Sequence, residues 1–122
     1  MLKDKDSAAI VAVTDMNRAR QFYETTLGLS LISGDENVMQ FATGSTALVV
    51  YRSDYAGSNK ANAIVWGVGS EIEAIVADLK ARGVVFEHYP DMNVQGDVHV
   101  AGDFKMVWFK DPDGNILHLN SL

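Results

Sequence analysis

The pattern of apolar and polar positions in the first half of the chain predicts one strand, one helix and three more strands. An apolar run at Ala8–Val13 leads to Asp15, a typical helix N-cap residue, and the helical apolar stripe that follows ends at Gly28. Strand-like patterns then occur at Leu29–Ser33, Asn37–Ala42 and Ala47–Arg52. The first half therefore predicts the order strand, helix, strand, strand, strand.

The second half repeats this order. A second apolar run at Ala63–Val68 precedes Ser70 and Glu73, which have the spacing of a capping box, and the predicted helix ends at Gly83. Ser70 and Gly83 each lie 55 positions after Asp15 and Gly28. The strands predicted after this helix are Val84–Tyr89, Phe104–Lys110 and Asn115–Asn120. The second copy is longer because it contains an insertion of about fifteen residues, which we place in a loop at Pro90–Asp103.

The repeat predicts a single α+β domain over residues 1–122, with one module at about 7–54 and a second at about 61–122. Each sheet has a helix to cover only one of its faces, so its other face needs a second apolar surface. We expect two βαβββ modules that form a curved, barrel-like trough, with one helix outside each sheet.

Composition narrows the classes of partner. The net charge of −6 argues against nucleic acid as a partner, and no apolar run is long enough to span a membrane. The chain has no cysteine, which excludes disulfides and cysteine-bound zinc. The first residues lack the apolar segment of a secretory signal, so we expect a cytoplasmic protein.

Two segments resemble a known family. Phe22-Tyr23 followed by Leu27-Gly28-Leu29, and the turn sequence Phe109–Asn115, are similar to motifs of the vicinal oxygen chelate superfamily. That superfamily contains glyoxalases, extradiol dioxygenases, fosfomycin-resistance enzymes and bleomycin-binding proteins. The resemblance implies the fold and a homodimer, whereas one fold supports several activities.

The resemblance also implies four positions at which metal-dependent members hold a divalent ion. In this sequence they correspond to Ala8, Val49, Ala63 and His118. Alanine and valine side chains have no donor atom, and one histidine does not make a metal centre. We therefore expect neither a metal nor another cofactor.

Strand alternation places Ile10 and Val65 on the faces that line the expected trough. The larger candidates for ligand contact are Gln40, Tyr51, Met106, Trp108, His118 and Asn120. Because neighbouring residues point to opposite faces, we assign Trp108 to the trough and Phe109 to the other face. Trp66 is assigned to the layer packed under the helix.

These candidates predict a metal-free protein that binds an aromatic or cationic small molecule in the trough. One alternative is an enzyme that uses His118 as a general acid or base, and another is a metal-dependent lyase or dioxygenase with its ligands elsewhere. His118 also has a structural alternative, as a cavity histidine bonded to Tyr51 or water. Asp111 and Asp113 are assigned to the turn.

Overall fold

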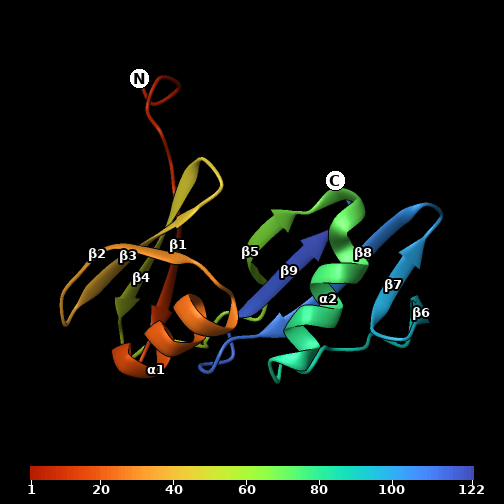
Figure 1. Ribbon diagram of the computed structural model, residues 1–122. Coiled ribbons are helices and arrows are strands. Elements are labelled where there is room, and N and C mark those ends of the chain that lie inside the picture. The colour runs from red at the N-terminus through yellow and green to blue at the C-terminus, as the bar shows by residue number, and fades with distance from the viewer. The chain divides into compact units, whose positions relative to one another are not determined.

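The computed structural model describes residues 1–122, which form two compact units, Met1–Ala56 and Gly57–Leu122 (Figure 1). None of its helices has the length and hydrophobicity needed to cross a membrane. Each unit combines a mainly antiparallel sheet with helical segments, and each begins with a strand, a helix and a return to the sheet. The predicted α+β class is confirmed, and so is the order of a strand, then a helix, then further strands in each half.

The first unit contains a four-stranded sheet in the order β1-β4-β3-β2. Its elements are β1 (Ala9–Val13), α1 (Met16–Arg20), the π-helical segment η1 (Gln21–Thr26), β2 (Ser30–Gly34), β3 (Val38–Thr43) and β4 (Thr46–Arg52). β1 pairs in parallel with β4, and the other neighbours are antiparallel.

The helix of the first unit begins and ends where the sequence predicts. The Asp15 carboxylate accepts the backbone N–H of Arg18 at 3.0 Å, and Gly28 adopts a φ of +75° that other residues rarely tolerate. Between these ends the helix buries Ala19 and Tyr23, and the Tyr23 ring lies 6.1 Å from the ring of Phe41 on β3. The helix is thereby fixed to one face of the sheet.

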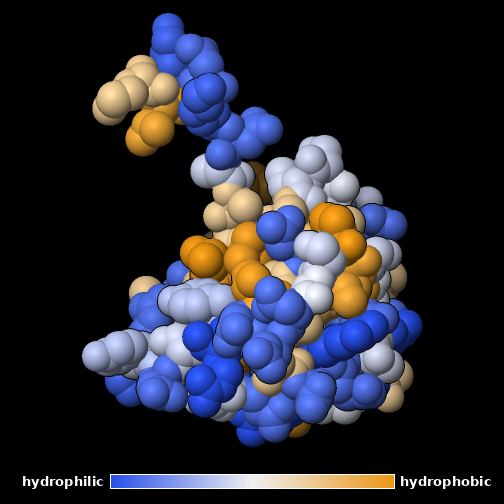
Figure 2. All heavy atoms as spheres, turned by 90° about the vertical axis from the view of Figure 1, so that its left-hand side faces the viewer, coloured by the Kyte–Doolittle hydropathy of each residue, from blue (hydrophilic) through white to orange (hydrophobic).

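The two faces of this sheet differ in exposure. Residues on the helix side, including Val13, Phe41 and Val50, are fully buried. On the opposite face Ile10 is 59% exposed and Tyr51 is 37% exposed. Figure 2 shows hydrophobic residues, in orange, at the surface among hydrophilic ones, in blue. The first unit therefore has one helix-free face with apolar side chains at the surface.

The second unit contains a five-stranded sheet in the order β5-β9-β8-β7-β6. Its elements are β5 (Asn62–Gly67), the 3₁₀ turn η2 (Gly69–Glu71), α2 (Ile72–Ala81), β6 (Asn93–Gln95), β7 (Val98–Ala101), β8 (Phe104–Lys110) and β9 (Ile116–Asn120). β5 pairs in parallel with β9, which repeats the arrangement of β1 and β4.

α2 covers one face of this sheet (Figure 1). Its buried residues Ile72, Val76 and Leu79 match a fully buried layer in the strands, which contains Val107 and Leu117. In the antiparallel register Trp108 pairs with His118, and Met106 pairs with Asn120. Side chains alternate along a strand, so these four residues lie on the face away from α2.

The predicted strand Val84–Tyr89 is wrong. Only an isolated bridge between Phe86 and Phe109 forms there, together with a hydrogen bond of 2.8 Å from the Glu87 N–H to the Trp108 carbonyl. The rest of the β8 edge is occupied by β7, whose residues pair with Phe104–Met106. The hairpin β6–β7 comes from the segment predicted to be a loop, so the chain has nine strands instead of eight.

The predicted capping box at Ser70 and Glu73 is also wrong. η2 precedes α2, whose N-cap Glu71 makes no side-chain hydrogen bond to the helix. The Glu73 carboxylate pairs with Lys105 of β8, which keeps its pKa below the usual value. At the other end Gly83, with a φ of +93°, follows the helix as predicted.

Asp111 organises the turn between β8 and β9. Its buried carboxylate accepts the backbone N–H groups of Asp113 at 3.0 Å and of Asn115 at 2.9 Å, and the Asn115 side-chain amide at 2.8 Å. Gly114 supplies the positive φ, +88°, that the turn requires. This turn sets the register that places Trp108 opposite His118.

Candidate ligand site

Trp108 is the centre of a group of rings on the helix-free face of the second unit. Its indole stacks on the imidazole of His118, with ring centroids 4.7 Å apart and planes inclined by 23°. Its Nε1–H donates a hydrogen bond of 3.1 Å to Oδ1 of Asn62 at the start of β5. The indole is therefore held from one side by a ring and at its polar edge by an amide.

The hydrogen bonds of His118 define its protonation state. Nδ1 lies 3.1 Å from the carbonyl oxygen of Val107, which can only accept, so Nδ1 carries the proton. Nε2 then accepts from the Asn120 side-chain amide at 3.3 Å, and Oδ1 of Asn120 accepts the Leu122 N–H at 3.2 Å. Burial lowers the pKa of His118, against the opposing effect of the bond to Val107, so the ring is neutral at pH 7.

Tyr89 and His99 complete the group. Both rings meet the Trp108 ring nearly at right angles, with centroids 5.1 and 5.0 Å from it. We call Tyr89, His99, Trp108 and His118 the aromatic cluster. Edge-to-face pairs at these distances each stabilise the packing by about 0.5–1.5 kcal/mol. The cluster contains no charged side chain at neutral pH, which suits a flat, weakly polar ligand.

Four of the six predicted ligand residues lie on this face: Met106, Trp108, His118 and Asn120. The other two, Gln40 and Tyr51, are exposed on the helix-free face of the first unit. Tyr89 and His99 were not among the predicted ligand residues. His99 reaches the cluster because it pairs with Met106 in a hairpin that the sequence pattern did not predict.

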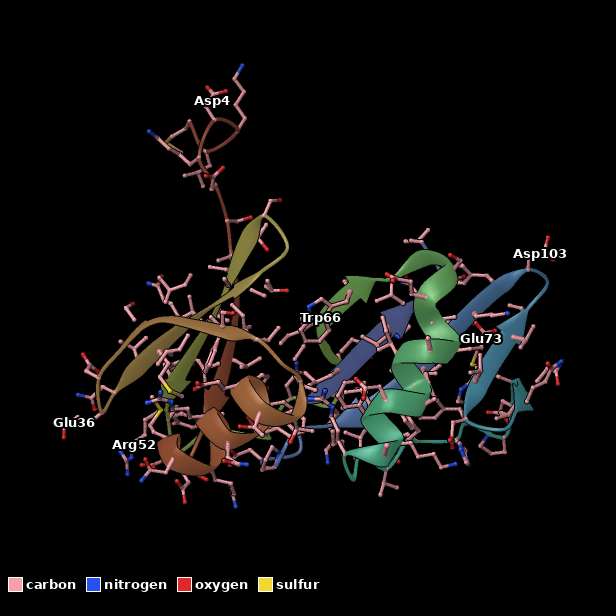
Figure 3. All side chains as sticks on the ribbon, viewed as in Figure 1. Asp4, Glu36, Arg52, Trp66, Glu73 and Asp103 are labelled. Carbon is pink, nitrogen blue, oxygen red and sulfur yellow. The ribbon has the colours of Figure 1, made fainter.

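Trp66 is half-buried and projects from β5, at the edge of the sheet (Figure 3). It pairs with Leu119, which lies in the layer covered by α2, so it is on the opposite face from Trp108. The two tryptophans thus report on different sides of one sheet.

The residues at the family's metal positions do not fit a metal. Val49 in β4 and Ala63 in β5 have no donor atoms, nor does Ala8, which precedes β1. No group of three or more histidine, cysteine, aspartate or glutamate side chains is close enough to share an ion. In His118 both ring nitrogens already have hydrogen-bond partners within the second unit. The donor set therefore gives no basis for a metal-dependent step.

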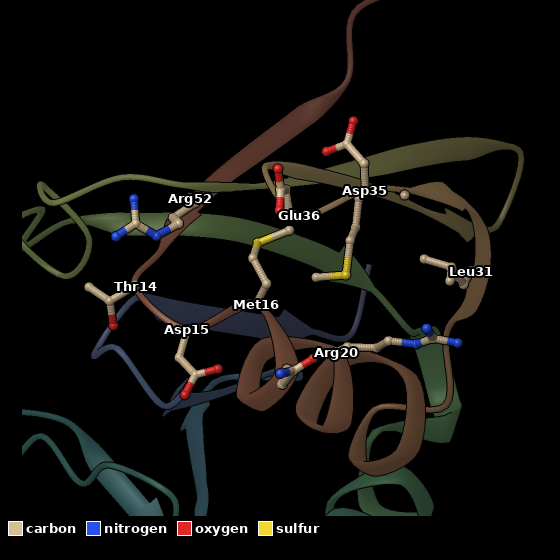
Figure 4. Close-up of a pocket in the computed structure, with 11 residues that line it drawn as sticks. Thr14, Asp15, Met16, Arg20, Leu31, Asp35, Glu36 and Arg52 are labelled. Atoms are coloured by element: carbon tan, nitrogen blue, oxygen red, sulfur yellow. The ribbon is translucent and has the colours of Figure 1, made fainter.

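A cavity of about 630 Å³ lies in the first unit, outside the predicted ligand residues (Figure 4). Met16, Leu31 and Met39 supply its apolar part, and charged side chains surround them. Several of these charges have structural partners: Asp15 caps α1, and Asp35 accepts two backbone N–H groups in the β2–β3 turn, which lowers its pKa. These contacts account for Asp15 and Asp35 without a ligand.

Comparison with known proteins agrees with this fold. The sequence model of the glyoxalase/bleomycin resistance protein/dioxygenase superfamily matches residues 7–119. The virulence protein STM3117 of Salmonella typhimurium is 21% identical, over 98% of this chain and 85% of that protein.

The solved structures that are similar to nearly the whole chain include two proteins named for their activities. FosX, a fosfomycin resistance protein of Listeria monocytogenes, has a TM-score of 0.77 at 18% identity, covering 99% of this chain and 93% of that one. Lactoylglutathione lyase of Agrobacterium tumefaciens has a TM-score of 0.73 at 15% identity, covering 96% and 92%. At these identities the structural likeness shows the fold alone. From the family match, the chain belongs to the glyoxalase/bleomycin resistance protein/dioxygenase superfamily.

Proposed function

We propose that this chain is a metal-free binding protein that takes a small aromatic molecule on the helix-free face of its second unit. The observation that carries the proposal is the Trp108–His118 stack, in which the polar atoms of both rings have partners within the unit. Such a stack is a rigid aromatic surface that needs no rearrangement to receive another ring. Rigid aromatic anchors dominate the affinity of many binding sites.

The hydrogen bonds of His118 favour binding over acid–base catalysis. A catalytic histidine usually has a carboxylate or carbonyl on one nitrogen and a free second nitrogen aimed at the substrate. Here the second nitrogen accepts from Asn120, and no carboxylate contacts the ring. An enzyme based on His118 would first have to break this bond.

The surroundings of the stack define the ligand class. Met106 contributes an apolar side chain, and Asn62 and Asn120 are the nearby amides, so a flat molecule with few charges is the best match. The net charge of −6 favours a cationic ligand only at long range. Gln40 and Tyr51 on the first unit are further proposed contacts, to be tested by substitution.

Three probes that share one ring system separate the effect of the aromatic ring from the effect of ligand charge. They are indole, which is neutral, tryptamine, which is cationic, and indole-3-acetate, which is anionic. Each is titrated into ¹⁵N-labelled protein, and the Trp108 Nε1–H and His118 Hε1 resonances are followed. The variants are Trp108→Leu, in which only the His118 signal is read, and Trp66→Phe as a matched control on the opposite face.

We expect saturable shifts with indole, and a Kd raised about tenfold or more in Trp108→Leu, as for a central aromatic anchor. The Kd of Trp66→Phe should stay within about twofold of wild type, because a change within about 0.5 kcal/mol is typical of residues outside a site. If none of the three probes binds, or if Trp66→Phe weakens binding as much as Trp108→Leu, the proposed site is wrong.

A further inference from the structure

The segment after α2 leaves the sheet and returns to it as part of the aromatic cluster. Glu87 is the last residue to bond to β8, through its N–H and the Trp108 carbonyl. Two residues later the Tyr89 ring lies edge-on to the Trp108 ring. The chain then turns away from the sheet, and the Met92 N–H closes this turn with a hydrogen bond of 3.1 Å to the Tyr89 carbonyl. Tyr89 therefore reaches Trp108 from outside the strands.

His99 bonds directly to the backbone of Tyr89. The Tyr89 N–H donates to Nε2 of His99 at 2.9 Å, so Nε2 is unprotonated and the neutral ring carries its proton on Nδ1. His99 is completely buried, and Nδ1 has no hydrogen-bond partner of good geometry. Nε2 is thus an acceptor enclosed by protein, and its lone pair is directed at one backbone N–H.

We propose that His99 is a positioning residue of the ligand site: by accepting the Tyr89 N–H it holds the Tyr89 ring against Trp108 as a second aromatic wall. This inference rests on the proposed function, because it names what shapes the same site. Tyr89 then selects flat rings that fit beside Trp108, and His99, whose own ring also packs edge-on against Trp108, sets the position of Tyr89.

The mechanism requires a neutral His99. A protonated imidazole has a donor on each nitrogen and no acceptor, so it cannot bond to the Tyr89 N–H. Burial lowers the pKa of His99, and the nearby His88 lowers it further. A hydrogen-bonding interaction with the backbone of Met106 raises the pKa and opposes both effects. Tyr89 is therefore held at neutral pH and released in acid.

Other titratable side chains lie around His99. The rings of His88 and Tyr89 lie 6.3 and 5.6 Å from it, and the Trp108 ring contacts both His99 and His118. The His88 ring bonds to the Asp97 carboxylate at 2.8 Å, and the same carboxylate pairs with Lys80 at 2.9 Å. Both contacts lower the pKa of Asp97, and the contact with Lys80 has the larger effect. His88 and His118 are thus the neighbouring imidazoles whose effects have to be separated from that of His99.

The first test uses the unmodified protein. Long-range ¹H–¹⁵N correlation spectra report which nitrogen of each histidine is protonated. We expect His99 as the Nδ1–H tautomer at pH 7.5, with a titration midpoint below the usual value of about 6.5. An Nε2–H tautomer, or a midpoint above that value, would overturn the proposal.

The second test compares two variants of the full chain. His99→Gln keeps an acceptor that does not titrate, whereas His99→Phe keeps the size of the ring and removes the acceptor. The readouts are the nuclear Overhauser effect between Tyr89 and Trp108 at pH 7.5 and pH 5, and the Kd for indole. In wild type we expect this Overhauser effect to disappear as His99 becomes protonated. In the variants His118→Gln and His88→Gln we expect it to persist at pH 7.5.

His99→Phe should weaken indole binding about tenfold at pH 7.5, the change that corresponds to about 1.4 kcal/mol. His99→Gln should restore the affinity to within about threefold, a difference below about 0.7 kcal/mol, and make it independent of pH. If both variants bind like wild type, or if the Tyr89–Trp108 contact follows the titration of His118, His99 does not position Tyr89. Failure of wild type to bind indole would instead reject the proposed function, while the Overhauser measurement still decides the role of His99.

Discussion

Asp111→Ala is predicted to be among the most destabilising single substitutions in the second unit. The Asp111 side chain is 4% exposed and its carboxylate accepts at least three hydrogen bonds, two of them from Asn115. Removing the carboxylate leaves these donors without an acceptor, and Asn115 is itself only 5% exposed. The turn that sets the pairing of Trp108 with His118 then loses its organising group.

The magnitude follows from these contacts. A hydrogen bond to a charged group contributes about 1.5–3 kcal/mol, and an unsatisfied buried donor costs about 1–3 kcal/mol. Bonds that share one carboxylate are not additive, and deletion also removes the cost of burying a charge. We expect Asp111→Ala to lower the free energy of unfolding by about 3–5 kcal/mol, and Asp111→Asn, which keeps one oxygen acceptor, by about 1–2 kcal/mol.

Urea unfolding at pH 7 measures this difference, with Trp108 as the single fluorescent tryptophan in a Trp66→Phe background. Asp103→Ala is the matched control, because Asp103 is an exposed carboxylate in the turn after β7 (Figure 3). It should change stability by less than about 0.5 kcal/mol. A loss below about 1 kcal/mol for Asp111→Ala, or equal losses for the alanine and asparagine variants, would refute this account of the turn.

The remaining predictions concern pH, metal, assembly and a surface ion pair. The pKa values of His99 and His118 are lowered by folding, so their contribution to stability is complete above about pH 6.5 and is lost as pH falls below it; urea midpoints that stay constant between pH 7.5 and 5 would contradict this. Elemental analysis of protein purified without chelator should find well under one divalent metal per chain, and a stoichiometric ion would restore the metal-dependent alternative. Sedimentation at micromolar concentration should show a homodimer, and a monomer would contradict the assembly that the family resemblance implies. Glu73→Gln should lower the urea midpoint only slightly, and 0.5 M salt should reduce the difference from wild type, because its pair with Lys105 is exposed.

Much of the fold was predictable because its signals are local. The N-cap at Asp15 and the glycines after each helix act within a few residues, and strand alternation correctly separated Trp108 from Phe109. The same alternation placed Trp108, His118 and Asn120 on one face, because the β8–β9 turn fixes their register over a short distance.

The wrong predictions concern residues whose structure depends on contacts with distant parts of the chain. Val84–Tyr89 has a strand-like pattern, but β7 pairs with Phe104–Met106 on the β8 edge that it would need, and no local pattern shows which segment obtains that edge. His99 and Tyr89 were missed for the same reason, since their meeting depends on the β6–β7 hairpin. At Glu73 a long-range pair with Lys105 replaces the expected cap.

The central claim, that a flat aromatic molecule binds on Trp108 in the second unit, is tested most directly by intermolecular Overhauser effects in a complex with ¹³C-labelled indole. We predict contacts from the bound ring to Trp108, Tyr89 and Met106, and none to Trp66 on the opposite face of the sheet. Contacts to Trp66, or to Met16 and Met39 in the cavity of the first unit, without any to Trp108, would contradict the claim.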